Sequence, residues 1–178
     1  MEIRQATLAD SAGIAKIQVD SYRTAYAGIL PAAYLEHFTH EEQAQDWRDW
    51  LSAKPQLLYV AVAESQEVIG YALGQHGADE LAPYESELVA LHVGKRFQGK
   101  GIGKRLFAAV SEELAAHGRR SLFLWMLADN PARGFYEKLG GKYVGEKAWQ
   151  NNAYFGTKIS EVAYGWLDIK ELFAADRR

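Results

Sequence analysis

The chain contains no cysteine among its 178 residues, which excludes disulfides, thiolate metal sites and a cysteine nucleophile. It also lacks a long apolar run, since none reaches the roughly 20 residues that a helix needs to span a bilayer. Neither charge dominates, because 20 Lys and Arg residues oppose 23 Asp and Glu, for a formal net charge of −3. We therefore expect neither a membrane nor a nucleic-acid partner, because a nucleic-acid surface would be basic.

Other patterns are missing as well. The five histidines show no metal-ligand spacing, so we expect no metal. No signal-peptide pattern is visible near Glu2 and Asp10, and a cytoplasmic protein is the default expectation. Hydrophobic residues at 48% and charged residues at 24% are ordinary for a globular protein. Because no linker, repeat or low-complexity tract divides the sequence, we expect one domain over residues 1–178.

Apolar periodicity switches between strand and helix patterns along the chain. It predicts strands over residues 3–6, 57–63, 68–75, 86–93, 121–127, 142–149 and 162–169. It predicts helices after Thr7-x-x-Asp10, around 34–35, over 39–51 and over 104–117. Residues 57–75 have the pattern of a hairpin, and 86–127 that of a βαβ unit. The sequence thus predicts an α/β fold with a mixed central sheet flanked by helices.

The most informative segment lies between the predicted strand 86–93 and the predicted helix 104–117. It is Gln98-Gly99-Lys100-Gly101-Ile102-Gly103-Lys104. Glycine permits positive φ and lets a ligand approach the backbone without meeting a Cβ atom. The first N–H groups of a helix lack intrahelical partners and lie at the positive end of the helix dipole. The segment is therefore typical of a phosphate-binding loop.

These glycines alone allow three interpretations. A nucleoside-triphosphate loop, GxxxxGK, would begin at Gly94, but Gly101 stands where Ser or Thr should hold Mg²⁺. The dinucleotide pattern GxGxxG fails because its third glycine position is Lys104. In the third interpretation the glycines form only a tight strand-to-helix turn.

A second segment follows the predicted strand 121–127. It is Asp129-Asn130-Pro131-Ala132-Arg133-Gly134-Phe135-Tyr136-Glu137-Lys138-Leu139-Gly140. Together with the upstream Gln98-x-x-Gly101-x-Gly103, it closely resembles the GNAT superfamily of N-acetyltransferases, and the resemblance extends over most of the chain. Two positions depart from the family pattern. The family's Asn coincides with Asp129, with Asn130 one residue later, and Gly141 stands where Phe is more common.

The resemblance implies acetyl-CoA as co-substrate. In the family the glycine motif holds the pyrophosphate, and the strand before it splays at a bulge so that its backbone binds the pantetheine arm. The cofactor-binding residues implied are Leu91, Val93, Gln98, Gly99, Lys100, Gly101, Ile102, Gly103, Lys104, Asn130 and Arg133. Whether Asp129 or Asn130 meets the pantetheine stays open.

The resemblance also implies catalytic roles. An amine must lose its proton before it attacks a thioester, because an alkylammonium has a pKa of about 10. Glu87 is the expected base, with Glu85 and His92 as alternatives. Tyr136 is expected to protonate the departing CoA thiolate, and Tyr26 to lie on the acceptor side.

The expected function is therefore transfer of the acetyl group of acetyl-CoA to an amine, by direct attack in a ternary complex. A small amine is favoured over a protein, but polyamines, amino acids and aminoglycosides all stay open. The alternative is a non-catalytic acyl-CoA-binding sensor, and Gly101 disfavours a nucleotide hydrolase. A homodimer is compatible with the sequence.

Overall fold

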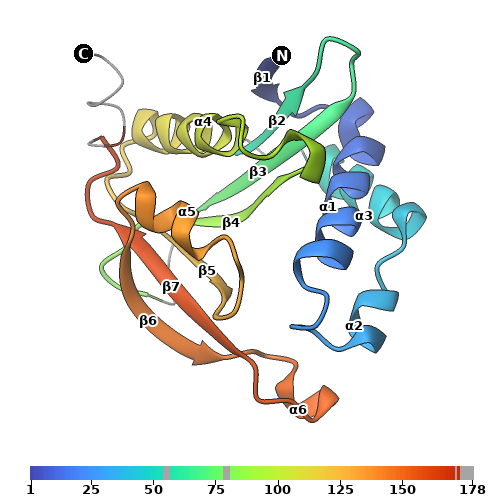
Figure 1. Ribbon diagram of the computed structural model, residues 1–178. Coiled ribbons are helices and arrows are strands. Elements are labelled where there is room, and N and C mark those ends of the chain that lie inside the picture. Colours follow the sequence, from blue (N-terminus) through green and yellow to red (C-terminus); the bar gives the residue numbers. More distant parts are fainter. Residues whose placement is uncertain (54–56, 78–80, 171, 173–178) are drawn as a thin grey trace.

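The computed structural model describes residues 1–53, 57–77, 81–170 and 172. In this part of the chain one sheet of seven strands has the order β1-β2-β3-β4-β5-β7-β6 (Figure 1). The strands are β1 (Glu2–Gln5), β2 (Leu58–Val62), β3 (Val68–His76), β4 (Ser86–Val93), β5 (Leu122–Leu127), β6 (Lys142–Ala148) and β7 (Ser160–Trp166). Neighbours are antiparallel except β4 and β5, which are parallel, so the predicted mixed sheet is confirmed.

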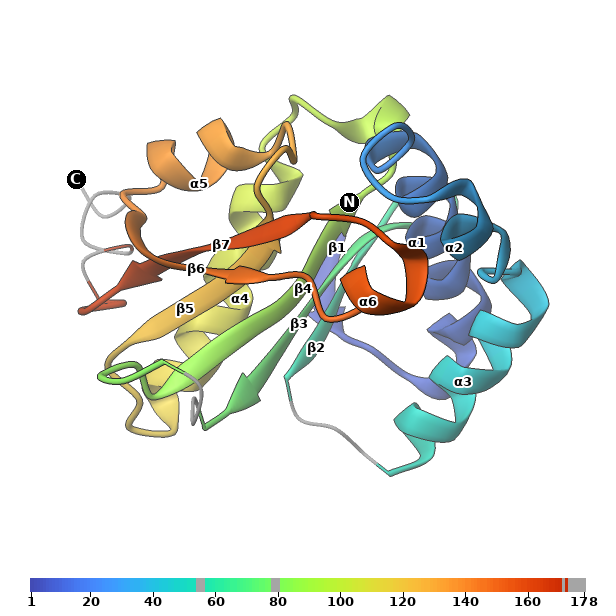
Figure 2. The ribbon, with the colours of Figure 1, turned by 90° about the horizontal axis from the view of Figure 1, so that it is seen from below.

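Helices cover both faces of this sheet. They are α1 (Ser11–Ala25), α2 (Ala32–Glu36), α3 (His40–Ser52), α4 (Ile102–Ala116), α5 (Arg133–Lys138) and α6 (Asn152–Phe155), with 3₁₀ turns η1 (Leu8–Asp10) and η2 (Lys95–Phe97). Ile14 of α1 and Leu51 of α3 are buried against Val60 on one face. Figure 2 shows α1, α2 and α3 gathered on one side of the molecule and α4 on the other.

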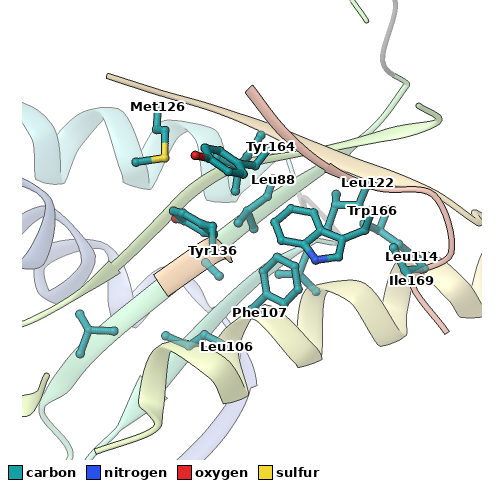
Figure 3. Close-up of a cluster of buried hydrophobic side chains, with 14 of the residues drawn as sticks. Leu88, Leu106, Phe107, Leu114, Leu122, Met126, Tyr136, Tyr164, Trp166 and Ile169 are labelled. Atoms are coloured by element: carbon teal, nitrogen blue, oxygen red, sulfur yellow. The ribbon is translucent and has the colours of Figure 1, made fainter. Parts of the chain in front are cut away.

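The larger core lies between α4 and the sheet (Figure 3). Phe107 of α4 contacts Trp166 of β7, with ring centroids 4.9 Å apart. Trp166 also explains Gly141, because a Cβ atom added there would lie 2.7 Å from Trp166 Cζ2. The indole fills that space and donates its Nε1–H to the Leu139 carbonyl at 2.9 Å. The space beside Gly141 is therefore filled by an aromatic side chain of β7, Trp166.

Thr7 and Asp10 form the predicted capping interaction at the start of the chain. Asp10 Oδ2 accepts hydrogen bonds from the Thr7 N–H at 2.7 Å and the Thr7 hydroxyl at 2.9 Å. The Arg4 guanidinium donates two more bonds to this carboxylate, at 2.8 and 2.9 Å. Burial by itself would raise the pKa of Asp10, but the hydrogen bonds from Arg4 and Thr7 outweigh it and lower the pKa.

Several predicted ends are shifted. The capped element is the 3₁₀ turn η1, and α1 begins only at Ser11. Helix α4 begins at Ile102 rather than at 104, so Ile102 and Gly103 of the glycine segment are helical. The last strand covers 160–166 rather than 162–169, and α6 is a helix that the sequence pattern does not predict.

Candidate active site

The two parallel strands at the centre of the sheet separate along their length. In the described part of the chain, β4 and β5 pair only where Glu87 lies opposite Phe123. Beyond that pair the strands diverge (Figure 1), and residues 88–93 and 124–127 line a cleft of about 860 Å³. Backbone N–H and C=O groups on the separated edges are therefore available to hydrogen-bond a ligand.

A β-bulge in β4 lies at the start of this separation. Leu73 of β3 pairs with Ala90, and the next residue, Gly74, pairs with Leu88, so Val89 is the extra residue. A bulge bends a strand and increases its local twist, which here accompanies the divergence of β4 from β5. Strand β4 thus contains a bulge close to the point at which it separates from β5.

The glycine loop lies where β4 leads into α4. Gly99 and Gly101 have φ of +74° and +77°, in the left-handed region that glycine adopts without strain. An added Cβ atom would have nothing within 4 Å at either position. The first bond of α4 runs from the Arg105 N–H to the Gly101 carbonyl at 3.1 Å, so the preceding N–H groups stand at an open helix end. This geometry is that of an anion-binding loop.

Gln98 and Gly103 fix the position of the loop. The Gln98 side-chain amide donates to the Val93 carbonyl at 3.0 Å, which ties the loop to the end of β4. A Cβ atom at Gly103 would lie 3.2 Å from Phe135 Cζ and 3.6 Å from Leu91 Cδ2. The third glycine therefore lets α4 approach both β4 and α5, and brings the two sequence motifs into contact.

Cationic side chains gather at this end of the cleft. Lys95 and Arg96 line the cleft, and Arg96 forms an ion pair with Glu67. The Arg96 guanidinium and the Lys100 ammonium lie 4.7 and 5.7 Å from the centre of the Phe97 ring. Lys104 is exposed in the first turn of α4. The side chains around the loop thus carry the charge that attracts phosphate groups.

The segment after β5 contains three residues considered for cofactor contacts, and only one of them lines the cleft. Asn130 lines the cleft, and its Oδ1 accepts a hydrogen bond from the Ala132 N–H at 2.8 Å. Asp129 is exposed and lies outside the cleft lining, so Asn130 is the better placed of the two.

Arg133 also lies outside the cleft lining. Its Nε donates to the Tyr164 hydroxyl at 2.6 Å and to Glu137 Oε1 at 3.3 Å. The predicted cofactor contact of Arg133 stays a prediction.

Tyr136 of α5 lies in the wall of the cleft and is only 7% exposed. Burial raises the pKa of its phenol well above 10. The hydroxyl is therefore protonated at neutral pH, which is the state that a proton donor requires. Leu91 and Val93, whose backbone is predicted to bind pantetheine, line the same cleft.

The candidate bases are placed very differently. Glu87 lies at the closed end of the separation, outside the cleft lining, and accepts a hydrogen bond from the Gln75 amide at 2.7 Å. Glu85 also lies outside, and its Oε2 accepts from the Arg120 N–H at 2.7 Å. His92 lines the cleft, but burial lowers its pKa to about 4, which makes it a weak base. The structure does not bring Glu87 and Tyr136 together, and the role of Glu87 stays a prediction.

Sequence reasoning missed a carboxylate that does line the cleft, Glu161 of β7. It lies near Tyr26, whose pKa is raised to about 12 by burial, by Tyr136 and by Glu161. Tyr26 therefore lies near both Tyr136 and Glu161, on the side where the acceptor is expected. No sequence motif marks Glu161, because its orientation depends on the pairing of β7 with β5.

Within the described ranges, no helix is long and apolar enough to cross a membrane. The same residues contain no group of three His, Cys, Asp or Glu side chains that could hold a metal ion.

Residues 19–141 match the acetyltransferase (GNAT) family. The uncharacterized N-acetyltransferase YuaI of Bacillus subtilis (strain 168) is 34% identical over 170 residues, which are 96% of this chain and 95% of that protein. These matches show that the chain belongs to the GNAT family of acetyltransferases and is an enzyme of that class.

More distant relatives agree with this assignment. The phosphinothricin N-acetyltransferase of Streptomyces coelicolor is 30% identical over 116 residues, 62% of this chain and 66% of that protein. The PaiA N-acetyltransferase from Thermoplasma acidophilum, solved with coenzyme A, has the same fold, with a TM-score of 0.69 at 20% identity over 93% of this chain and 98% of that chain.

Proposed function

We propose that the chain binds acetyl-CoA with its pyrophosphate on the glycine loop and its pantetheine between the separated strands. The observation that carries the proposal is the placement of an open helix end, with two positive-φ glycines, beside a cleft between β4 and β5. The N–H groups of residues 99–104 would hold the phosphates. The backbone of Leu91 and Val93, together with Asn130, would hold the pantetheine arm.

The acetyl group would then pass directly to an amine in a ternary complex. The amine nitrogen attacks the thioester carbonyl carbon, the carbon–sulfur bond breaks, and Tyr136 would donate its proton to the leaving thiolate. The nitrogen would then release its second proton, which restores the Tyr136 hydroxyl. The ammonium proton must leave before the attack. Glu87 stays the predicted base, and from the closed end of the separation it would act through water. Holding both reactants in one site supplies the orientation that catalysis needs.

A small acceptor fits the proposal better than a long peptide. Tyr26, at the C-terminal end of α1, and Tyr34 of α2 line the cleft on the side where the acceptor would bind. The relative from Streptomyces coelicolor is named for a small molecule, phosphinothricin.

Release of free CoA from acetyl-CoA, measured against a panel of amines, tests the proposal. We expect release with at least one amine and CoA binding by calorimetry. A sensor without catalytic function would bind CoA and release none with any acceptor. Failure to bind CoA would contradict both the enzyme and the sensor.

A further inference from the structure

Two segments that are far apart in the sequence meet on the acceptor side of the cleft. One runs from the end of α1 to α2 and contributes Tyr26, Leu30 and Tyr34 to the cleft lining, and the other joins β6 to β7 and contributes Trp149. The Tyr34 ring centre lies 5.0 Å from that of Trp149 and 5.6 Å from that of Phe155 in α6. Both contacts are edge to face, and Figure 2 shows α6 beside α1 and α2. We call Tyr34, Trp149 and Phe155 the aromatic bridge, because they join the two segments directly.

The aromatic bridge is part of a packed cluster at the end of β5. Trp149 is buried together with Leu30 and Leu127, and the rings of Tyr34 and Phe155 pack against this cluster. The Trp149 and Phe155 rings are also stacked, with 5.9 Å between their centres. Since Leu127 is the last residue of β5, the cluster connects α2 to one of the two separated strands. Opening the cluster would expose apolar surface to water, which is unfavourable.

Hydrogen bonds hold the segment between β6 and β7 in one shape. Its two ends are joined by the Trp149 N–H, which donates to the Ile159 carbonyl at 2.9 Å. Within it, Asn152 Oδ1 accepts from the Thr157 hydroxyl at 2.6 Å and from the Ile159 N–H at 2.8 Å. Asn152 Nδ2 donates to the Ile159 carbonyl at 2.6 Å. The segment therefore presents Trp149 and Phe155 to α2 from a fixed base.

The space between the aromatic bridge and the separated strands is walled by further rings. Tyr26 and Tyr22 lie edge to face, with 4.9 Å between ring centres, and the Tyr22 ring centre lies 5.8 Å from that of His92 in β4. All three side chains line the cleft. An acceptor amine that enters the cleft from this side would therefore lie between the separated strands and the aromatic bridge.

We propose that the aromatic bridge limits the length of the acceptor, so that the enzyme acetylates a free small amine and excludes an amino group that continues into a peptide chain. This inference rests on the proposed acetyl transfer. Aromatic rings with centres 5.0 Å apart are in van der Waals contact, so no chain passes between Tyr34 and Trp149. A longer acceptor on this side must first separate the buried cluster, and the lost burial counts against that acceptor and not against a small one. Tyr34 and Trp149 are thus specificity-determining residues.

Two pairs of amines test the length limit in the unaltered enzyme. L-alaninamide and the tripeptide amide of L-alanine share their reacting end and differ in length, as do benzylamine and 4-phenylbenzylamine. With release of free CoA from acetyl-CoA as the readout, we expect kcat/KM to be roughly tenfold or more lower for the longer member of each pair. Equal use of the two members of either pair would overturn the length limit and leave acetyl transfer standing. Absence of CoA release with these and every other amine would overturn the proposed function instead.

Two variants disrupt the aromatic bridge from opposite sides, and a neighbouring residue supplies the matched control. Tyr34→Ala removes a ring from α2, and Phe155→Ala removes one from α6. Tyr154→Ala also removes a ring from α6, but Tyr154 is 81% exposed and lies outside the cleft lining. We expect both bridge variants to raise kcat/KM for the longer amines roughly tenfold and to leave CoA affinity within about twofold. Tyr154→Ala should match the unaltered enzyme.

Two results with these variants would overturn the inference. If neither bridge variant gained activity with either longer amine, the aromatic bridge would not limit the acceptor, whatever the smaller amines do. If Tyr154→Ala gained as much as the bridge variants, the gain would reflect loosening of α6 and not loss of the bridge. Thermal melting identifies the folded variants, and because the two bridge variants change different segments, one folded variant is enough to decide.

Discussion

Gly101 offers a sharp test of the glycine loop, because the fold contains a matched control. Gly101 and Gly118 have φ of +77° and +79°, and an added Cβ atom would have nothing within 4 Å at either position. Gly101 begins α4, and Gly118 follows its C-terminal end. The 15 residues of α4 separate the two sites by about 22 Å, given a rise of about 1.5 Å per residue. Replacing each by alanine imposes the same backbone cost at opposite ends of one helix.

The structure sets the size of both effects. A left-handed conformation costs an L-residue about 1–2 kcal/mol, and no steric clash adds to it here. For a chain of this length each kcal/mol lowers Tm by about 2–4 °C, so both variants should melt about 2–8 °C early. At Gly101 the methyl group would also stand at the proposed phosphate site. Loss of one charge-assisted hydrogen bond, about 1.5–3 kcal/mol, weakens CoA binding by about 10- to 150-fold.

Thermal melting and calorimetric titration with CoA measure the two effects separately. We expect Gly101→Ala and Gly118→Ala to lose similar stability, and only Gly101→Ala to lose CoA affinity. If both variants bound CoA within twofold of the unaltered enzyme, the loop would not hold the phosphates. If both lost affinity alike, the effect would reflect stability and not the loop.

Three further changes test other parts of the structure. Tyr136→Phe should lower kcat and kcat/KM together while CoA affinity stays unchanged, because only the hydroxyl is lost; turnover equal to the unaltered enzyme would exclude it as the proton donor. Asp10→Asn should lower the free energy of unfolding at pH 7 by about 2 kcal/mol, as measured by urea denaturation. The pKa of Asp10 is lowered in the fold, so its contribution is present above the unfolded value of about 3.8 and should vanish as the pH falls below it. The pKa of His92 is about 4 in the folded protein and about 6.5 in the unfolded chain. The free energy of unfolding should therefore fall as the pH drops from about 6.5 to 4. His92→Gln should reduce this pH dependence, as measured by urea denaturation.

The sequence predicted the parts of this site that depend on local backbone. The glycine loop and the helix that follows it are local features, and both are present near residues 98–104. The segment around Tyr136 is equally local, and the tyrosine lines the cleft. The capping interaction of Thr7 and Asp10 spans three residues and is also present.

The carboxylates were harder to predict because their orientation depends on pairing between distant strands. Glu87 and Glu161 both occur near strand ends, and sequence periodicity alone does not say which one meets the cleft. The answer depends on where β4 separates from β5 and on the register of Leu127 against Glu161. The predicted strand 162–169 also began one residue too late to include Glu161. The placement of Arg133 was equally hard to predict, because its hydrogen-bond partner Tyr164 lies 31 residues away in the chain.

The contact between Gly103 and Phe135 gives a physical reason for the two motifs to occur together. Both glycines before Gly103 serve the loop through positive φ, but Gly103 is helical and serves packing. Its missing side chain lets Phe135 approach, with 3.2 Å from the ring to the position of an added Cβ atom. Tyr136 follows Phe135 in α5, so this contact ties the glycine loop to the segment that carries the tyrosine. If the loop holds the cofactor as proposed, the same contact would position the thioester relative to Tyr136.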